Sequence, residues 1–164
     1  MLIHSSTVLN HVNTAVTYSD KTDTLFDIKI ESIVRGLTPD CKKTLQKISK
    51  ENALTIIEYI ISMQTEINLS SHYQKDLILL LCRFSRSNNH KPFQQLTRPE
   101  IITFLDSFRK SEEIDLLHKW IGTYNLYSVH LLRFFKWLYY SEVEPAKRPK
   151  PSVVENIPQS LVPY

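Results

Sequence analysis

The chain has 164 residues, of which 42% are hydrophobic, which suits one globular core and is too little for two full domains. With only two glycines, it lacks the turns of an all-β fold and any glycine loop for phosphate binding, so helices are expected. A net charge of +3 allows a polyanionic partner without requiring one.

Residues 1–37 mix Ser, Thr, Asn and Asp with isolated hydrophobic residues and follow neither a helical nor a strand period. They predict a flexible N-terminal arm. No signal peptide is indicated, and no apolar run approaches the roughly 20 residues that span a bilayer. Cys41 and Cys82 lack the spacing of a metal site. We therefore expect a soluble cytoplasmic protein with no membrane contact, metal or other cofactor.

Two helices are predicted after the arm. Pro39 follows Thr38 as it does in a first helical turn, which indicates a short helix over 39–48. Ser49 is placed to cap a longer helix, in which apolar residues recur at spacings of three and four. The second helix therefore belongs to the core.

Three further helical segments follow. Ser70 or Ser71 starts one that ends before the proline of the loop 88–92. The pair Thr97 and Glu100 has the spacing of a capping box and starts a helix to about 108. After an irregular connection ended by Gly122, the last helix is predicted over 123–140, with Phe134 and its neighbours on the core side.

The segment 145–164 combines prolines with basic residues, which predicts an extended basic linker. The predicted fold is thus all-α. It is a compact bundle of four main helices over 38–144, preceded by the arm at 1–37 and followed by the Pro-rich linker at 145–164.

Basic residues on the polar side of the last helix are candidate phosphate contacts. Arg133 and Lys136 are three residues apart and could reach phosphates of one nucleic-acid strand together. A solvated charged face, which needs no partner, explains the same pattern.

Three blocks of sequence match a known domain in the same order. They are 69–77, which opens a helix, 96–101, which enters a short helix, and 131–138, which precedes a proline-rich exit. Over 49–158 the chain resembles the SAM-like core-binding domain of tyrosine recombinases (phage integrases), especially archaeal members. In that family the domain is one half of a clamp around duplex DNA, and a separate domain carries the catalytic residues.

The resemblance implies a non-catalytic, nucleoid-associated protein that binds double-stranded DNA in recombination or integration. Its further partners would be a recombinase catalytic domain or other recombinase protomers. The sequence stops where the catalytic domain of the family would begin, as a truncated gene, a natural fragment or an excised piece would. The implied DNA contacts lie on the helices that start near 70 and 123: Ser71, His72, Lys75, Tyr124, Asn125, Tyr127, Arg133 and Lys136.

Enzymatic activity has little support in the sequence. His130 and Arg133 match the His-x-x-Arg pattern of recombinase active sites, but so short a pattern recurs by chance and its Arg, Lys and Tyr partners are missing. We expect no enzyme and no small-molecule substrate. The alternative function is a protein-interaction module that docks a partner through the aromatic last helix and the Pro-rich tail.

Overall fold

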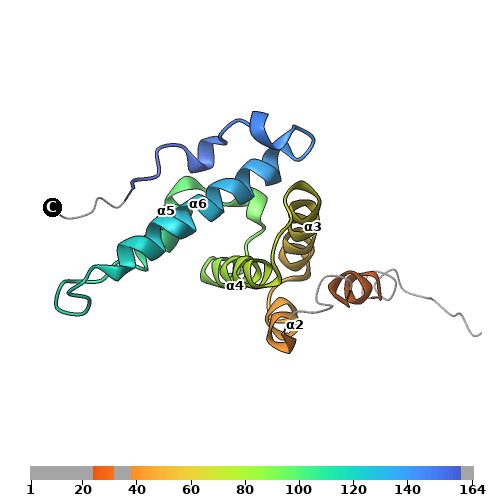
Figure 1. Cartoon of the computed structure of the whole chain (residues 1–164), viewed down its shortest axis with the longest axis horizontal. Helices are drawn as coiled ribbons and strands as arrows, with labels where there is room; N and C mark the ends of the chain where they lie inside the picture. The colour runs from red at the N-terminus through yellow and green to blue at the C-terminus, as the bar shows by residue number, and fades with distance from the viewer. Residues whose placement is uncertain (1–23, 32–37, 160–164) are drawn as a thin grey trace, which may run out of the picture.

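The computed structural model describes residues 24–31 and 38–159, and every regular element in these ranges is a helix (Figure 1). The all-α prediction is therefore confirmed. The elements are a helix at 24–31, α2 (Pro39–Gln46), α3 (Lys50–Glu66), α4 (Ser71–Ser87), α5 (Arg98–Asp106) and α6 (Lys119–Tyr140), with short 3₁₀ turns η1 (Phe93–Gln95), η2 (Pro145–Lys147) and η3 (Ser152–Val154).

The starts of three helices agree with the local sequence signals. Thr38 precedes Pro39 at the start of α2. The hydroxyl of Ser49 accepts a hydrogen bond from the Asn52 amide (3.3 Å), and the hydroxyl of Ser70 accepts one from the Tyr73 amide (3.2 Å). Each serine thereby satisfies an amide that has no partner inside its helix, which is why the helices begin there.

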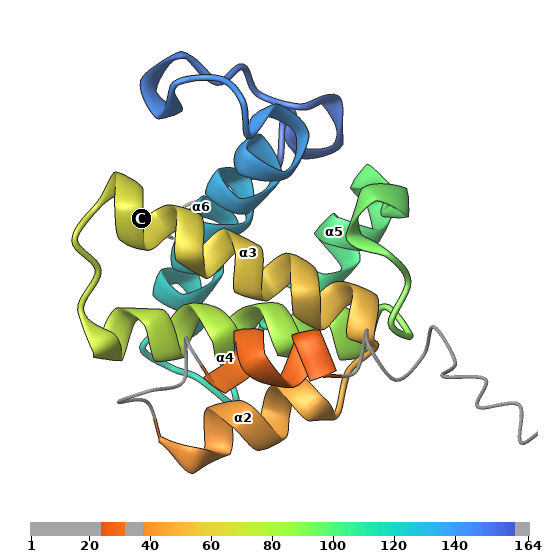
Figure 2. The ribbon, with the colours of Figure 1, turned by 90° about the vertical axis from the view of Figure 1, so that its right-hand side faces the viewer.

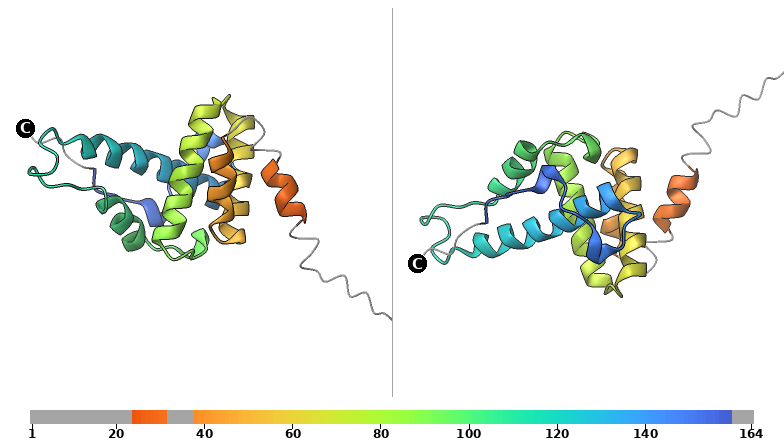
Figure 3. Two further views of the ribbon diagram at one scale, coloured as in Figure 1. Left: turned by 90° about the horizontal axis from the view of Figure 1, so that it is seen from below. Right: turned by 90° about the horizontal axis from the view of Figure 1, so that it is seen from above.

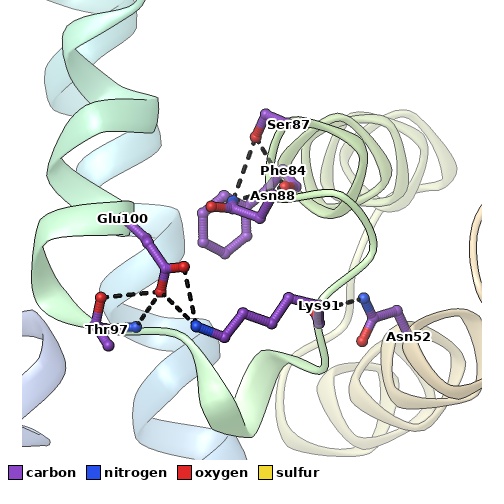
Figure 4. A network of polar contacts seen from close by, with 7 residues as sticks. All are labelled: Asn52, Phe84, Ser87, Asn88, Lys91, Thr97 and Glu100. Atoms are coloured by element: carbon purple, nitrogen blue, oxygen red, sulfur yellow. Dashed lines mark hydrogen bonds and ion pairs between the residues drawn. The ribbon is translucent and has the colours of Figure 1, made fainter.

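Glu100 organises the loop between α4 and α5 (Figure 4). Its carboxylate accepts hydrogen bonds from the Thr97 amide (2.8 Å) and hydroxyl (2.9 Å) and pairs with Lys91 (3.0 Å). These donors hold the pKa of Glu100 near 2. The Lys91 carbonyl in turn accepts from the Asn52 side chain (3.0 Å), so one network links the loop to both α5 and α3.

Aromatic rings fill the core where α6 crosses the other helices. Phe134 and Phe135 are fully buried, and the Phe134 ring makes edge contacts with Tyr59 and Phe93 at centroid distances of 5.2 and 5.0 Å. Burial also raises the pKa of the Tyr59 hydroxyl. The predicted core face of the last helix is therefore confirmed around its centre.

The molecule has two parts that share α6. At one end α2 and α3 pack on α4. At the other end α5 and α6 lie side by side and extend to their connecting loop (Figures 1 and 3). Figure 2 shows α2, α4 and α3 stacked in this order, with α6 behind them. No helix within 24–31 and 38–159 is long and apolar enough to cross a bilayer.

The predicted flexible arm at 1–37 is wrong for one part of its length. Residues 24–31 form a helix in which Phe26 and Ile30 are buried. Lys29 pairs with Glu58 of α3 at 3.3 Å, which helps to fix this helix on the bundle. Phe26 and Ile30 are four residues apart, but one such spacing in so short a segment does not establish a helical period. The rest of the predicted arm lies outside the described residues.

The predicted linker is also wrong, over 145–159, because this segment packs against the bundle. Val154 is buried, and Arg148 is only 8% exposed. The Arg148 guanidinium donates to both carboxylate oxygens of Glu66, at 2.6 and 3.1 Å, and to three backbone carbonyls just after or at the end of α6. Prolines favour extended backbone, but they do not prevent it from packing. Residues 160–164 of the predicted linker are not described.

The last helix begins earlier than predicted. The Asp115 carboxylate accepts a hydrogen bond from the Trp120 amide (2.9 Å), so it satisfies the first turn of a helix that starts at Lys119. Gly122 lies inside this turn and does not end the preceding segment. The sequence signal of the glycine was thus overridden by a carboxylate placed to cap the helix.

Candidate functional site

The start of α4 meets the middle of α6 at the hydroxyl of Tyr73. This oxygen lies 3.2 Å from Nδ1 of His130, and the Arg133 guanidinium donates to it at 3.4 Å. The Tyr73 and His130 rings are in edge contact, with centroids 5.4 Å apart. The contact orients Arg133, whose side chain is otherwise exposed, along the surface of the bundle.

His130 is buried, and its burial, together with the nearby charge of Arg133, lowers its pKa below the usual value of 6.5. It is therefore a neutral imidazole at pH 7, able to hydrogen-bond with Tyr73 without adding a second charge next to Arg133.

A cleft of about 350 Å³ lies beside this contact, and we call it the cationic cleft. Among the cations that line it, Arg148 is already paired with Glu66. No carboxylate in the described part of the chain lies within ion-pair distance of Arg133 or Lys136. The cleft therefore presents two uncompensated positive charges. Its lining residues are Met63, Glu66, Ile67, Arg133, Lys136, Pro145 and Arg148.

A second cleft, of about 480 Å³, lies between α4 and α6 and includes Tyr73 and His130 in its lining. Its arginine, Arg83, is stacked 4.5 Å from the ring of Phe108. Its carboxylate belongs to Asp76, which lies 3.6 Å from the imidazole of His72. Arg83, the cation of this cleft, is thus already engaged, in contrast to Arg133 and Lys136 of the cationic cleft.

Three of the predicted DNA contacts belong to α4. Ser71 and His72 are exposed in its first turn. Lys75 is half-buried and follows Tyr73 by two residues, or about 200° around the helix, so it lies on the opposite side of α4 from α6. The expectation that Lys75 shares one surface with Arg133 and Lys136 is therefore corrected.

The other predicted contacts at the start of α6 point mainly inward. Tyr124 is fully buried and its hydroxyl donates to the Pro158 carbonyl (2.8 Å), so the structure contradicts its assignment to a DNA surface. Tyr127 is half-buried with its ring against Phe108 (4.9 Å), and Asn125 is half-buried.

The sequence missed Tyr73, Glu66 and Arg148 as site residues. Tyr73 falls on the core-facing side of its helix, where an aromatic residue needs no further role to explain it. Arg148 lay in the predicted linker, and its pairing with Glu66 spans 82 positions, so no local pattern indicates it. Only Arg133 and Lys136 were predicted and also lie together in the cleft.

Within the part of the chain that the structure describes, no group of three or more His, Cys, Asp or Glu side chains is placed to hold a metal ion. Comparison of the chain with protein-family models, with curated proteins and with solved structures gave no match.

Proposed function

We propose that the protein binds duplex DNA through backbone phosphates at the cationic cleft. The observation that supports this proposal is the pair Arg133 and Lys136, two cations that share a walled cleft and lack a carboxylate partner among the described residues. A phosphate would supply the missing negative charge. Apolar walls exclude part of the water around it, which strengthens the attraction.

The two side chains suit successive phosphates of one strand. They are three residues apart on α6, so they project to the same side of the helix about one turn apart. The Tyr73 hydroxyl holds Arg133 in one orientation before binding, which reduces the entropy lost on contact. His72, exposed at the positive end of the α4 dipole, is a further candidate contact. Ser71 precedes Tyr73 by two residues and therefore lies, like Lys75, on the side of α4 away from α6.

Binding by this surface alone would be weak and would not depend on sequence. Roughly two or three phosphate contacts correspond to affinities typical of nonspecific binding, with Kd on the order of 10⁻⁴ to 10⁻⁶ M. Phosphate contacts carry no sequence information, so they would set the affinity without specifying a site.

The proposed biological role is that of a non-catalytic DNA-binding module in recombination or integration, associated with the nucleoid and acting beside a recombinase catalytic domain or other protomers. The order of helices α3 to α6 and the three sequence blocks that carry the resemblance support this role. Tyr73 beside His130 and Arg133 makes one direct check necessary. Supercoiled plasmid should remain unnicked by the purified protein, and a covalent DNA adduct on Tyr73 would refute the non-catalytic part.

Salt dependence tests the interface. We expect log Kd for a duplex to vary linearly with log salt, and Arg133→Ala or Lys136→Ala to reduce the slope by about 0.9 each, equally on unrelated sequences. Lys110→Ala, an exposed cation outside the cleft, is the matched control and should change little. Equal losses from Lys110→Ala and Arg133→Ala would show a bulk charge effect and refute the site.

The alternative function, docking of a protein through the aromatic last helix and the Pro-rich tail, has less support. Phe134 and Trp137 are buried, and Val154 of the tail packs into the bundle. Most of the aromatic surface proposed for that partner is thus covered by the chain itself, and Tyr139, 41% exposed, is the aromatic residue of α6 that remains open. Binding to a protein with little salt dependence would still favour this alternative.

A further inference from the structure

The loop 111–117 lies at the far end of the paired helices α5 and α6 (Figure 3), and we call it the apolar tip. It exposes three large hydrophobic side chains. Ile114, Leu116 and Leu117 are 75%, 79% and 72% exposed, more than any other large hydrophobic residue in the described ranges. Scattered exposed hydrophobics are ordinary, but a contiguous group at a protruding end indicates a contact surface.

The tip is held in a defined shape. Backbone amides of Ile114 and Asp115 donate to the Ser111 carbonyl (3.1 and 3.0 Å), and the Asp115 carboxylate binds the Trp120 amide at the start of α6. The amides of Trp120 and Lys119 lower the pKa of Asp115, which keeps its side chain charged and bonded at neutral pH. The apolar side chains are therefore presented by an ordered turn, which lowers the entropic cost of docking.

Between the flanking cations Lys110 and Lys119, the tip itself carries only acidic charges, those of Glu112, Glu113 and Asp115. Glu113 is exposed with no ion pair among the described residues, and Glu112 lies 3.7 Å from His118 at the edge of the tip. A surface that binds the apolar tip must therefore combine apolar walls with positive charge.

The cationic cleft has this complementary chemistry. Met63, Ile67 and Pro145 give it apolar walls, and Arg133 and Lys136 give it unpaired positive charge. Its volume of about 350 Å³ is that of a small binding cleft, enough for side chains but not for a whole helix.

The tip and the cleft of one chain are too far apart to meet. α6 is continuous from Lys119, next to the tip, to Tyr140, and its axis advances about 21 Å between Lys119 and Arg133. We propose that the apolar tip of one copy docks into the cationic cleft of a second copy. The contact joins different surfaces of identical chains, so it extends head to tail into a ring or an open chain.

The inference rests on the residues of the cleft, and it stands whether or not DNA is also a ligand. If both proposals hold, the acidic tip and DNA phosphates compete for Arg133 and Lys136. DNA would then dissociate the head-to-tail assembly, and assembly would weaken DNA binding.

Sedimentation equilibrium of the full chain over roughly 10 µM to 1 mM tests self-association at the strength expected of a small contact. The average mass of the wild type should rise with concentration, whereas Leu116→Ser combined with Leu117→Ser should remain monomeric. Ile28→Ser, which changes a 59% exposed residue on the helix at 24–31, is the matched control and should associate as the wild type does.

Charge exchange identifies the two surfaces. Glu113→Lys and Lys136→Glu should each reduce association, because each leaves like charges facing one another. An equimolar mixture of the two variants should associate in alternation, because the tip of each variant then matches the cleft of the other, and both changes in one chain should restore self-association. Failure of the mixture to pair, or a wild type that remains monomeric at about 1 mM, refutes the proposal.

Two other outcomes distinguish self-association from lipid binding and from the proposed DNA binding. If the wild type is monomeric but binds phosphatidylcholine–phosphatidylserine vesicles, and the Leu116 and Leu117 changes abolish this binding, a lipid surface is the occupant and the inference is wrong. At protein concentrations too low for self-association, the same tip variant should bind DNA like the wild type. Unchanged DNA binding with no self-association in any protein therefore refutes this inference alone, while lost DNA binding only in Lys136→Glu supports the proposed function.

Discussion

Replacement of Arg148 by Met removes the link between the C-terminal segment and the bundle. The Arg148 side chain is only 6% exposed, and its guanidinium donates hydrogen bonds to Glu66 and to three carbonyls at once. Methionine fills similar space but supplies no donor. The variant leaves the Glu66 carboxylate, 18% exposed, without its cation.

The expected loss of stability follows from these contacts. Removing one partner of a buried ion pair costs about 3–5 kcal/mol, because the other charge remains desolvated and unpaired. For a chain of this size, the midpoint of thermal unfolding should fall by roughly 6–20 °C. Arg148→Lys should lose part of this amount, since a single ammonium cannot replace a fork that reaches both Glu66 oxygens and the carbonyls together.

Urea unfolding followed by circular dichroism measures the change. Lys147→Met is the matched control, because the neighbouring Lys147 pairs with Glu144 at the surface, where both side chains are largely exposed. It should cost less than about 1 kcal/mol. A loss below about 1 kcal/mol for Arg148→Met would mean that the segment after α6 does not depend on this pairing, and the reasoning would fail.

Four further changes test the fold. Phe134→Ala should cost about 3–5 kcal/mol in chemical denaturation, because it empties the centre of the aromatic core; a cost below about 1 kcal/mol would place the ring at the surface. Ser70→Ala should cost about 1 kcal/mol through the lost cap, whereas Ser71→Ala, one residue later, should be nearly neutral. Gly122→Ala should stabilise the protein by about 0.5–1 kcal/mol, since an added Cβ meets nothing within 4 Å and the helix continues through it; destabilisation would contradict the position of the helix start. His130, whose pKa is lowered by burial and by Arg133, binds its proton more readily in the unfolded chain, so its contribution is present above pH 6.5 and is lost as the pH falls toward its folded pKa. The wild type should therefore lose more stability than His130→Gln between pH 7.5 and 5.5, and equal losses would show that His130 is not desolvated.

Local signals predicted the helices well because their causes are local. Ser49 and Ser70 cap their helices through amides three residues ahead, and the spacing of Leu131, Phe134 and Phe135 brings them to one side of α6. These relations span less than two turns, so a single stretch of sequence contains them completely.

The candidate site depended on contacts that no such stretch contains. Tyr73 reaches Arg133 across 60 positions, and its role follows only from the crossing of α4 and α6. Tyr124 shows a different error. It precedes Leu131 by seven residues and so shares the core face of α6, but the family resemblance suggested a DNA contact, and the resemblance was given more weight than the helical period.

The packing of α2 on α4 encloses both thiols of the described chain, Cys41 and Cys82, which are fully buried. Burial raises the pKa of Cys82 to about 12, and alkylating reagents attack the thiolate. Neither thiol can react until α2 moves away from α4. The rate of alkylation under native conditions is therefore a built-in measure of how often this end of the bundle opens, and it requires no introduced label.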